Sequence, residues 1–209
     1  MVAQPVVHLY HPFEIISAWV APKADSEFVY SEAGTSGIST VKTYAYGNPA
    51  HLELTQLTET NSNGTQRITR MKYPADYASG GGNVEATAIT AMKGTANQHS
   101  AVIERWVSEK VGSTEKVVSA ELTAFRQYAS GQYMPYQRFV LDTAAPVTNF
   151  SPSTISGSFG KDSRYRLQEA ANSYDAYGRI TQLADARGKV TNYSYGGVAL
   201  QPKVNFRVP

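Results

Sequence analysis

Residues 173–196 read SYDAYGRITQLADARGKVTNYSYG, and this stretch decides the fold class. It contains Asp-x-x-Gly twice, at Asp175–Gly178 and at Asp185–Gly188. Asp accepts a backbone hydrogen bond at the start of a tight turn, and Gly supplies the left-handed position at its end. Residues 180–184, between the turns, alternate as a short strand does. The stretch therefore predicts successive β-hairpins that build a surface and not an active site, with tyrosine rings stacked on neighbouring hairpins and hydroxyls in water.

This pattern resembles the YD repeat of the Rhs family, in which Tyr-Asp is followed by Gly-Arg and an apolar residue, then by Asp-x-x-Gly, then by Thr-x-Tyr. Segments 46–77 and 162–168 are also similar to diverged parts of large Bacteroidetes-type Rhs repeat proteins. The residues that match the repeat, and that we take as candidate site residues, are Tyr174, Asp175, Gly178, Arg179, Asp185, Gly188, Thr191 and Tyr193.

The resemblance implies a long antiparallel sheet that spirals into a hollow shell, which in the family encloses a C-terminal toxin or presents a cell surface. The self-cleaving core motif and the toxin domain of full-length members are not recognisable here, so no toxin activity is carried over. Pro202 and Pro209 stand where a complete shell needs further repeats. We therefore expect a shell segment with open edges that pair with further Rhs-type sheet of the same or another chain.

The rest of the sequence predicts the same all-β class, an antiparallel meander forming a curved sheet or partial shell. We expect residues 1–36 to be an N-terminal extension with strands and residues 37–209 to be the sheet domain. The sequence Asn61-Ser62-Asn63-Gly64 predicts a hairpin, because Asn and Gly both tolerate the positive φ of primed turns. Strand-like runs occur at 13–20, 28–30, 38–46, 51–60, 65–73, 101–107, 116–118, 125–128 and 136–141.

One short helix is predicted near 83–93, between a loop at 74–82 and the strand at 101–107. Asn83 is suited to cap its start and Gly94 to end it. The residues that would share its buried face are Val84, Ala88, Ile89 and Met92. The Pro-, Thr-, Ser- and Gly-rich segment 142–161 is predicted to be a loop.

Composition argues against several classes of function. Nineteen basic against seventeen acidic residues leave a charge of +2, which is too little for nucleic-acid binding. The absence of cysteine removes disulfides and thiolate catalysis. We find no signal peptide and no apolar stretch long enough for a transmembrane helix, and expect an exported location, at a cell surface or outside the cell, as part of a larger protein.

Candidate chemistry is weak throughout, and we expect neither an enzyme nor a cofactor or metal site. His8 and His11 lack a third ligand at a metal-site interval. The triglycine at 80–82 lacks the Lys-Ser/Thr of a phosphate loop, and we expect it to be a flexible loop. Asp175 and Asp185 would act as paired carboxylates only if the hairpin brought them within catalytic separation. Ser113, Ser130 and Ser163 have no nucleophile-elbow context.

The leading hypothesis is a non-enzymatic structural Rhs/YD-repeat module of a larger exported bacterial protein, acting as shell or surface scaffold. The rival is a surface module that binds carbohydrate or protein through exposed Tyr and Trp; an enclosed effector or a glycan would then be a partner. A third hypothesis is a glycan-cleaving enzyme. Buried aromatics favour the scaffold, an exposed aromatic strip favours the binder, and a pocket with two carboxylates favours the enzyme.

Overall fold

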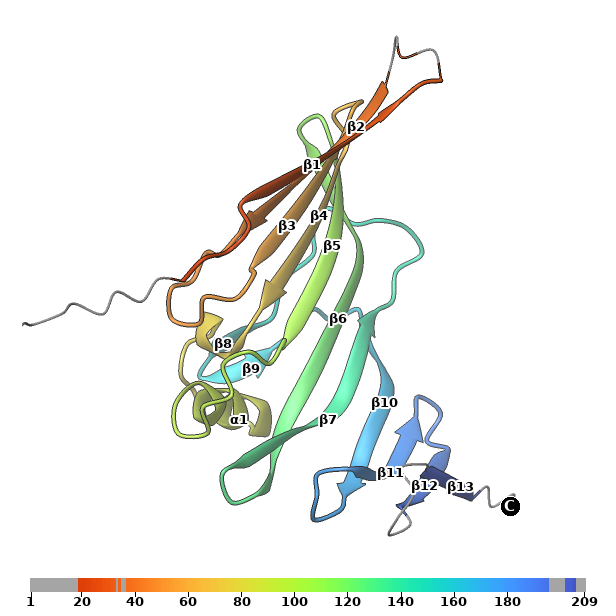
Figure 1. Ribbon diagram of the computed structural model, residues 1–209. Helices are drawn as coiled ribbons and strands as arrows, with labels where there is room; N and C mark the ends of the chain where they lie inside the picture. Colours follow the sequence, from red (N-terminus) through yellow and green to blue (C-terminus); the bar gives the residue numbers. More distant parts are fainter. Residues whose placement is uncertain (1–18, 33, 35–36, 196–201, 206–209) are drawn as a thin grey trace, which may run out of the picture.

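The computed structural model describes residues 19–32, 34, 37–195 and, as backbone alone, 202–205. These residues form an 11-stranded antiparallel sheet, a small 2-stranded sheet and one α-helix (Figure 1). The large sheet consists of β1 (Ala24–Tyr30), β2 (Gly37–Ala45), β3 (Gln56–Asn61), β4 (Gln66–Lys72), β5 (Glu104–Val111), β6 (Thr114–Ala129), β7 (Gln132–Leu141), β10 (Tyr165–Tyr174), β11 (Ile180–Asp185), β12 (Val190–Tyr195) and β13 (Pro202–Asn205). The other elements are η1 (Pro74–Asp76), α1 (Val84–Lys93), β8 (Thr154–Ser156) and β9 (Ser158–Gly160).

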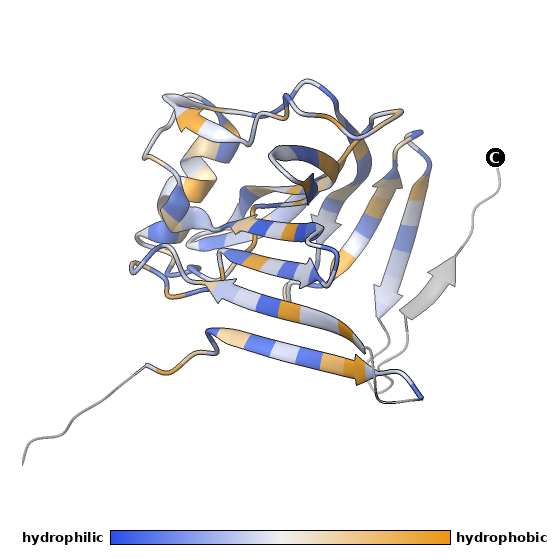
Figure 2. Cartoon of the chain, turned by 90° about the horizontal axis from the view of Figure 1, so that it is seen from above, coloured by the Kyte–Doolittle hydropathy of each residue, from blue (hydrophilic) through white to orange (hydrophobic). Residues whose placement is uncertain are grey.

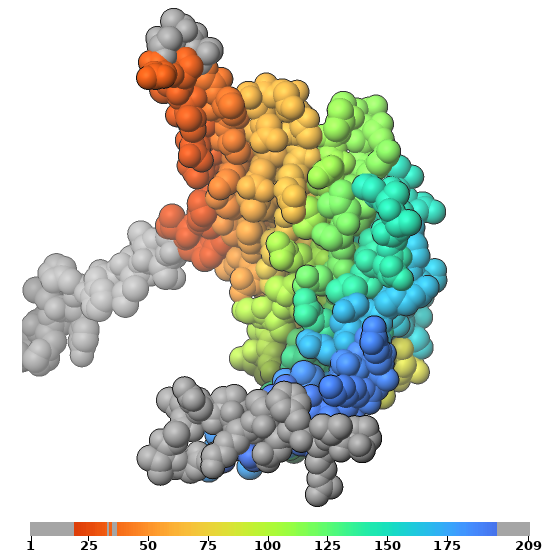
Figure 3. Space-filling view, turned by 90° about the vertical axis from the view of Figure 1, so that its right-hand side faces the viewer, coloured from red at the N-terminus to blue at the C-terminus, as the bar shows by residue number. Residues whose placement is uncertain are grey.

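The strands of the large sheet follow one another in chain order, and every neighbouring pair is antiparallel. In Figure 3 they form one bent layer that runs from β1 at the upper left to the blue C-terminal strands at the lower right. Over the described residues the sheet is curved and does not close, so that β1 and β13 are its two edges there. The predicted all-β meander is confirmed.

Several strand boundaries differ from the sequence-based expectation. The meander of three strands over 38–73 is confirmed, but β3 begins at Gln56 and not at residue 51. Residues 48–52 form a turn instead, because the Asn48 side chain accepts from Ala50 N at 2.9 Å and Leu52 has a positive φ of 56°. Of the strand predicted at 13–20, residues 13–18 lie outside the described residues. Trp19 and Val20 are described and have no regular secondary structure.

The runs predicted at 116–118 and 125–128 are parts of a single strand, the 16-residue β6. Its pairing shifts register at Val107/Ser108 of β5 and again at Ala124/Phe125. Such irregularities bend a strand and increase its twist without ending it. They therefore allow one long strand to follow the curvature of the sheet. This is why the two runs predicted as separate strands belong to one strand.

Three hairpin turns share one backbone geometry. Asn61 N donates to Thr65 O at 3.0 Å and Gly64 N to Asn61 O at 2.8 Å, and the same two bonds occur at Asp175 and at Asp185. The glycines Gly64, Gly178 and Gly188 have φ of 79°, 76° and 80°. Asn63 does not have a positive φ, so the primed turn predicted at Asn63-Gly64 is wrong. The loop is a type I turn followed by a left-handed glycine.

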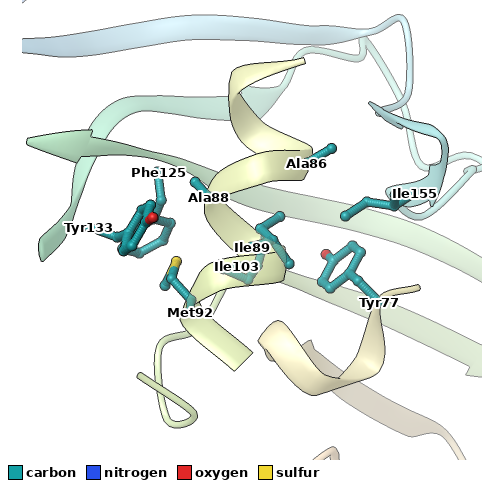
Figure 4. Close-up of a cluster of buried hydrophobic side chains, with 9 residues drawn as sticks. All are labelled: Tyr77, Ala86, Ala88, Ile89, Met92, Ile103, Phe125, Tyr133 and Ile155. Carbon is teal, nitrogen blue, oxygen red and sulfur yellow. The ribbon is translucent and has the colours of Figure 1, made fainter. Parts of the chain in front are cut away.

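Helix α1 and the β8–β9 hairpin lie against the same face of the sheet, which we call the covered face. The predicted cap is confirmed, since the Asn83 side chain accepts from Ala86 N. Figure 4 shows the cluster between helix and sheet, to which α1 contributes Ala86, Ala88, Ile89 and Met92. Val84 was predicted to share this buried side but is 57% exposed, and Ala86 takes its place in the cluster.

Residues 142–161, which we call the strap, were predicted to be a loop, but they contain β8 and β9 and pack on the covered face. The predicted flexible triglycine is packed against them. Gly81 N and Gly82 N both donate to Gly157 O, at 3.2 and 3.0 Å. A Cβ on Gly80 would lie 2.4 Å from the same carbonyl oxygen. Glycine is therefore required by close backbone approach and not by flexibility.

The opposite face, which we call the open face, has neither helix nor strap on it in the described residues. Hydrophilic and hydrophobic residues alternate along several strands of the sheet, as the colouring in Figure 2 shows. Within the described part of the chain, neither α1 nor η1 has the length and apolar character needed to cross a membrane.

The turn geometry predicts a large difference between two Gly→Ala variants. Gly188→Ala should lower the free energy of unfolding by about 1–2 kcal/mol, because an L residue is strained at positive φ. Gly160→Ala is the matched control, since Gly160 lies outside the left-handed region with open space around its Cβ position. Urea unfolding measures both, and equal effects would contradict the turn assignment.

Candidate functional site

Four of the candidate residues, Asp175, Gly178, Asp185 and Gly188, lie in the turns at the two ends of β11. At the first turn, Asp175 Oδ1 accepts from Tyr177 N at 2.9 Å and from Arg179 N at 3.0 Å. Gly178 N donates to Asp175 O at 2.9 Å. The aspartate therefore satisfies the backbone donors of the turn, and the glycine reverses the chain.

The second turn repeats this arrangement. Asp185 Oδ1 accepts from Arg187 N and Lys189 N, both at 2.9 Å, and Gly188 N donates to Asp185 O at 2.9 Å. The two turns are separated by the length of β11, about 20 Å at the usual strand rise. This exceeds the separation of a catalytic carboxylate pair, about 5–10 Å. Asp175 and Asp185 are thus not brought together.

Arg179 connects the first turn to β12. Its Nε and Nη2 lie 2.7 and 2.6 Å from Asp175 Oδ2. Its guanidinium carbon lies 5.0 Å from the centre of the Tyr177 ring and 4.3 Å from that of Tyr195. Tyr195 in turn donates its hydroxyl to Ile180 O at 2.7 Å. The arginine therefore forms a bridge between the first turn and β12.

The remaining motif residues are strand residues. Tyr174 ends β10, is buried, and donates its hydroxyl to Pro135 O. Its ring lies 5.3 Å from that of Tyr128. Thr191 pairs with Leu183 and Tyr193 with Val204. The tyrosine hydroxyls were expected to lie in water, but those of Tyr174 and Tyr195 donate to backbone carbonyls. These two tyrosines therefore connect one strand to another.

A groove of about 400 Å³ lies beside this motif on the open face. Its walls are mostly apolar, with the Arg138 guanidinium at the rim, 3.5 Å from Glu121 and 3.8 Å from Glu169. The lining residues are Thr123, Met134, Pro135, Tyr136, Gln137, Arg138, Glu169, Ala171, Tyr174, Gly178, Ile180 and Leu183. The groove could hold an apolar side chain, and it includes two motif residues, Tyr174 and Gly178.

The aromatic side chains do not form an exposed strip in the described residues. Five tyrosines are buried: Tyr73, Tyr77, Tyr133, Tyr165 and Tyr174. The exposed aromatics are scattered, with Phe28 and Tyr30 on β1, Tyr128 at the end of β6, and Tyr177, 85% exposed, in the first YD turn. Trp19, also exposed, stacks edge-on against Tyr46.

A buried polar cluster on the covered face was not found from the sequence. Glu104 on β5, fully buried, accepts from Ser153 N at 2.8 Å, from Ser153 Oγ at 2.7 Å and from Tyr165 Oη at 2.8 Å. Tyr77 shares a hydrogen bond with Ser153 Oγ at 2.7 Å, and Lys72 Nζ donates to Ser153 O. Glu104 and Ser153 are inaccessible to a substrate, so the cluster ties the strap to the sheet.

Burial raises the pKa of Glu104. The hydrogen bonds from Ser153 and Tyr165 and the charge of Lys72 lower it, but by less than burial raises it. Burial also lowers the pKa of Lys72, and burial together with the Glu104 charge raises the pKa of Tyr165. One signal in the sequence could have indicated this site. Glu104 is an acidic residue inside the apolar run 101–107, and a charge in such a run needs partners.

The structure describes two of the four histidines, His51 and His99. His8 and His11 lie outside the described residues. His51 Nδ1 accepts from Glu53 N at 2.9 Å, so its Nε2 carries the proton that faces Asp76 Oδ1 at 3.3 Å. Across the residues described here, no three His, Cys, Asp or Glu side chains cluster closely enough to hold a metal ion.

Comparison with known proteins yields no relative: no family model matches the chain, and neither the curated proteins nor the solved structures include a significant match. The fold and the turns thus define the chain as an open, curved antiparallel meander.

The strap is also held by a charged pair at its C-terminal end. Arg164 Nε and Nη2 donate to Asp162 at 2.8 and 2.7 Å, and Asp162 also accepts from Ser151 N at 3.0 Å. The hydrogen bonds from Arg164 hold the pKa of Asp162 well below its ordinary value. Asp162 is buried, whereas the Arg164 side chain is partly exposed.

Asp162→Asn should therefore lower the free energy of unfolding by about 2 kcal/mol at pH 7. Because the folded pKa is depressed, the stabilisation is present above about pH 4 and is lost as pH falls further. The difference between wild type and variant should shrink from pH 5 to pH 2 in urea titrations. Asp142→Asn, which removes an exposed pair with Arg166 at 3.8 Å, is the control and should change little. A difference that stays constant with pH would refute the role of the Asp162 charge.

Proposed function

We propose that the chain is a non-enzymatic structural module, an Rhs/YD-type sheet segment of a larger exported bacterial protein that serves as shell or surface scaffold. The single observation that carries this proposal is the pair of turns at Asp175 and Asp185. Their hydrogen bonds are the same at both sites, which is the behaviour of a repeated backbone unit. A unit of this kind extends a sheet by successive hairpins.

Two further features support a scaffold. The motif side chains fasten strands to one another: Arg179 bridges to β12, and Tyr174 and Tyr195 donate to carbonyls of β7 and β11. In the part of the chain that the structure describes, the sheet ends in two open edges, β1 and β13. Open edges are sites where further sheet adds.

The rival proposal is a surface module that binds carbohydrate or protein. The groove beside Tyr174 favours it, because an apolar groove with a charged rim suits a side chain of a partner. The scattered positions of the exposed aromatics count against an extended glycan platform, which needs rings on one continuous surface. The scaffold is therefore the better-supported function.

Two tyrosine variants separate the proposals. Tyr174→Phe removes the hydroxyl that bonds Pro135 O and should lower the free energy of unfolding by about 1 kcal/mol. Tyr177→Ser, at an exposed position in the same turn, should change it by less than about 0.5 kcal/mol. Chemical denaturation measures both, and a glycan array with the wild-type chain should show no binding. Glycan binding that Tyr177→Ser abolishes without loss of stability would contradict the scaffold and favour the binder.

A further inference from the structure

A row of alternating charges crosses six strands on the open face. The register places Asp25 of β1 opposite Lys42, Lys42 opposite Glu59, and Glu59 opposite Arg67. It continues with Arg67 opposite Glu109 and Glu109 opposite Lys116 of β6. Directly opposed residues in an antiparallel sheet lie on one face with their Cβ atoms about 5 Å apart, and unlike charges there are favourable. Each interior member of the row thus has a charge of opposite sign on both sides.

Asp25, at the end of this row, has an oppositely charged neighbour on one side only, which is Lys42 of β2. The edge strand β1 carries a second acidic residue on the same face, Glu27, whose opposite residue on β2 is the uncharged Thr40. Among the described residues, neither carboxylate forms an ion pair. A strand added at this edge would meet a negative charge at two alternate positions.

The far end of the β1–β2 hairpin is apolar and exposed. It projects beyond the rest of the sheet in Figure 1, and the end of β1 is hydrophobic in Figure 2. Phe28, Tyr30 and Ile38 are 53%, 68% and 65% exposed. An edge strand with uncovered apolar residues readily pairs with another strand, and here the apolar end follows directly on the acidic positions.

Two ways of pairing this edge with a second copy of the chain are unfavourable. Two-fold pairing over all seven residues of β1 would be centred on Glu27 and would set Glu27 against itself. Head-to-tail pairing with β13 is less favourable for another reason. All ten strand junctions are antiparallel, so β13 runs in the same direction as β1 and would pair with it in parallel. We therefore take the partner to be a different strand.

We propose that β1 is the docking edge for an antiparallel strand of another segment or chain that carries basic residues opposite Asp25 and Glu27 and a β-branched residue opposite Val29. The inference rests on the proposed scaffold role, since it specifies the chemistry of the sheet that adds to this segment. The added strand extends the charge row by one basic residue and covers one side of the apolar hairpin end.

The test uses two synthetic peptides, N-acetylated and C-amidated: Thr-Val-Thr-Lys-Thr-Lys-Thr and its counterpart with Glu in place of both Lys. In the antiparallel register, the two charged positions face Glu27 and Asp25. At low salt the Lys peptide should bind at least about threefold more tightly and should slow hydrogen exchange of the β1 amides. High salt should remove the preference, because exposed charges are screened.

Two variants with the same change in net charge make the test specific. Asp25→Lys should weaken or reverse the preference for the Lys peptide, whereas Asp142→Lys, an exposed carboxylate outside β1, should leave it intact. Equal binding of both peptides, protection at a site other than β1, or β1 protection that grows with protein concentration alone would each overturn the inference. The scaffold proposal fails separately, through Tyr177-dependent glycan binding.

Discussion

The structure depends on one constraint: a single curved sheet must cover one of its faces, and the cover must be fastened to it. The covered face is buried by α1 and the strap, and the fastening is the Glu104 carboxylate, which accepts three hydrogen bonds from Ser153 and Tyr165. A buried carboxylate is costly unless its lone pairs are satisfied. The hydrogen bonds that satisfy the carboxylate also hold the strap in place. As a result, β8 and β9 lie against Tyr77 and the triglycine.

The sequence predicts those parts of the fold in which local chemistry is decisive. The helix at 84–93 follows from Asn83, Gly94 and the spacing of Ala88, Ile89 and Met92, and the β2–β4 meander follows from alternation and its turn at Gly64. Contacts between distant segments could not be predicted. The sequence of the strap predicts a loop because its strands are only three residues long. Their turn contacts a distant segment, since the Gly157 carbonyl accepts from the backbone N–H groups of residues 81 and 82.

In the candidate site, too, the sequence predicts the local contacts and not the contacts between distant segments. Asp175 and Gly178 lie in a turn because of contacts within five residues, and a sequence motif can predict contacts of this short range. The groove and the charge row are assembled from strands whose register is set across the whole sheet, so no local pattern contains them. An open sheet with repeated turns, fastened aromatics and an acidic edge is consistent with a scaffold whose specificity lies in how it adds further strands.

Hydrogen exchange of the strap in Glu104→Gln, followed by mass spectrometry, tests the central claim most directly. Replacing one carboxylate oxygen by an amide donor leaves a buried hydrogen bond unmade, which costs about 1–3 kcal/mol. The strap amides should therefore exchange about tenfold faster or more through local opening, while β5 and β6 remain protected. Glu121→Gln, on the open face, is the control. Strap exchange in Glu104→Gln as slow as in that control would contradict the account.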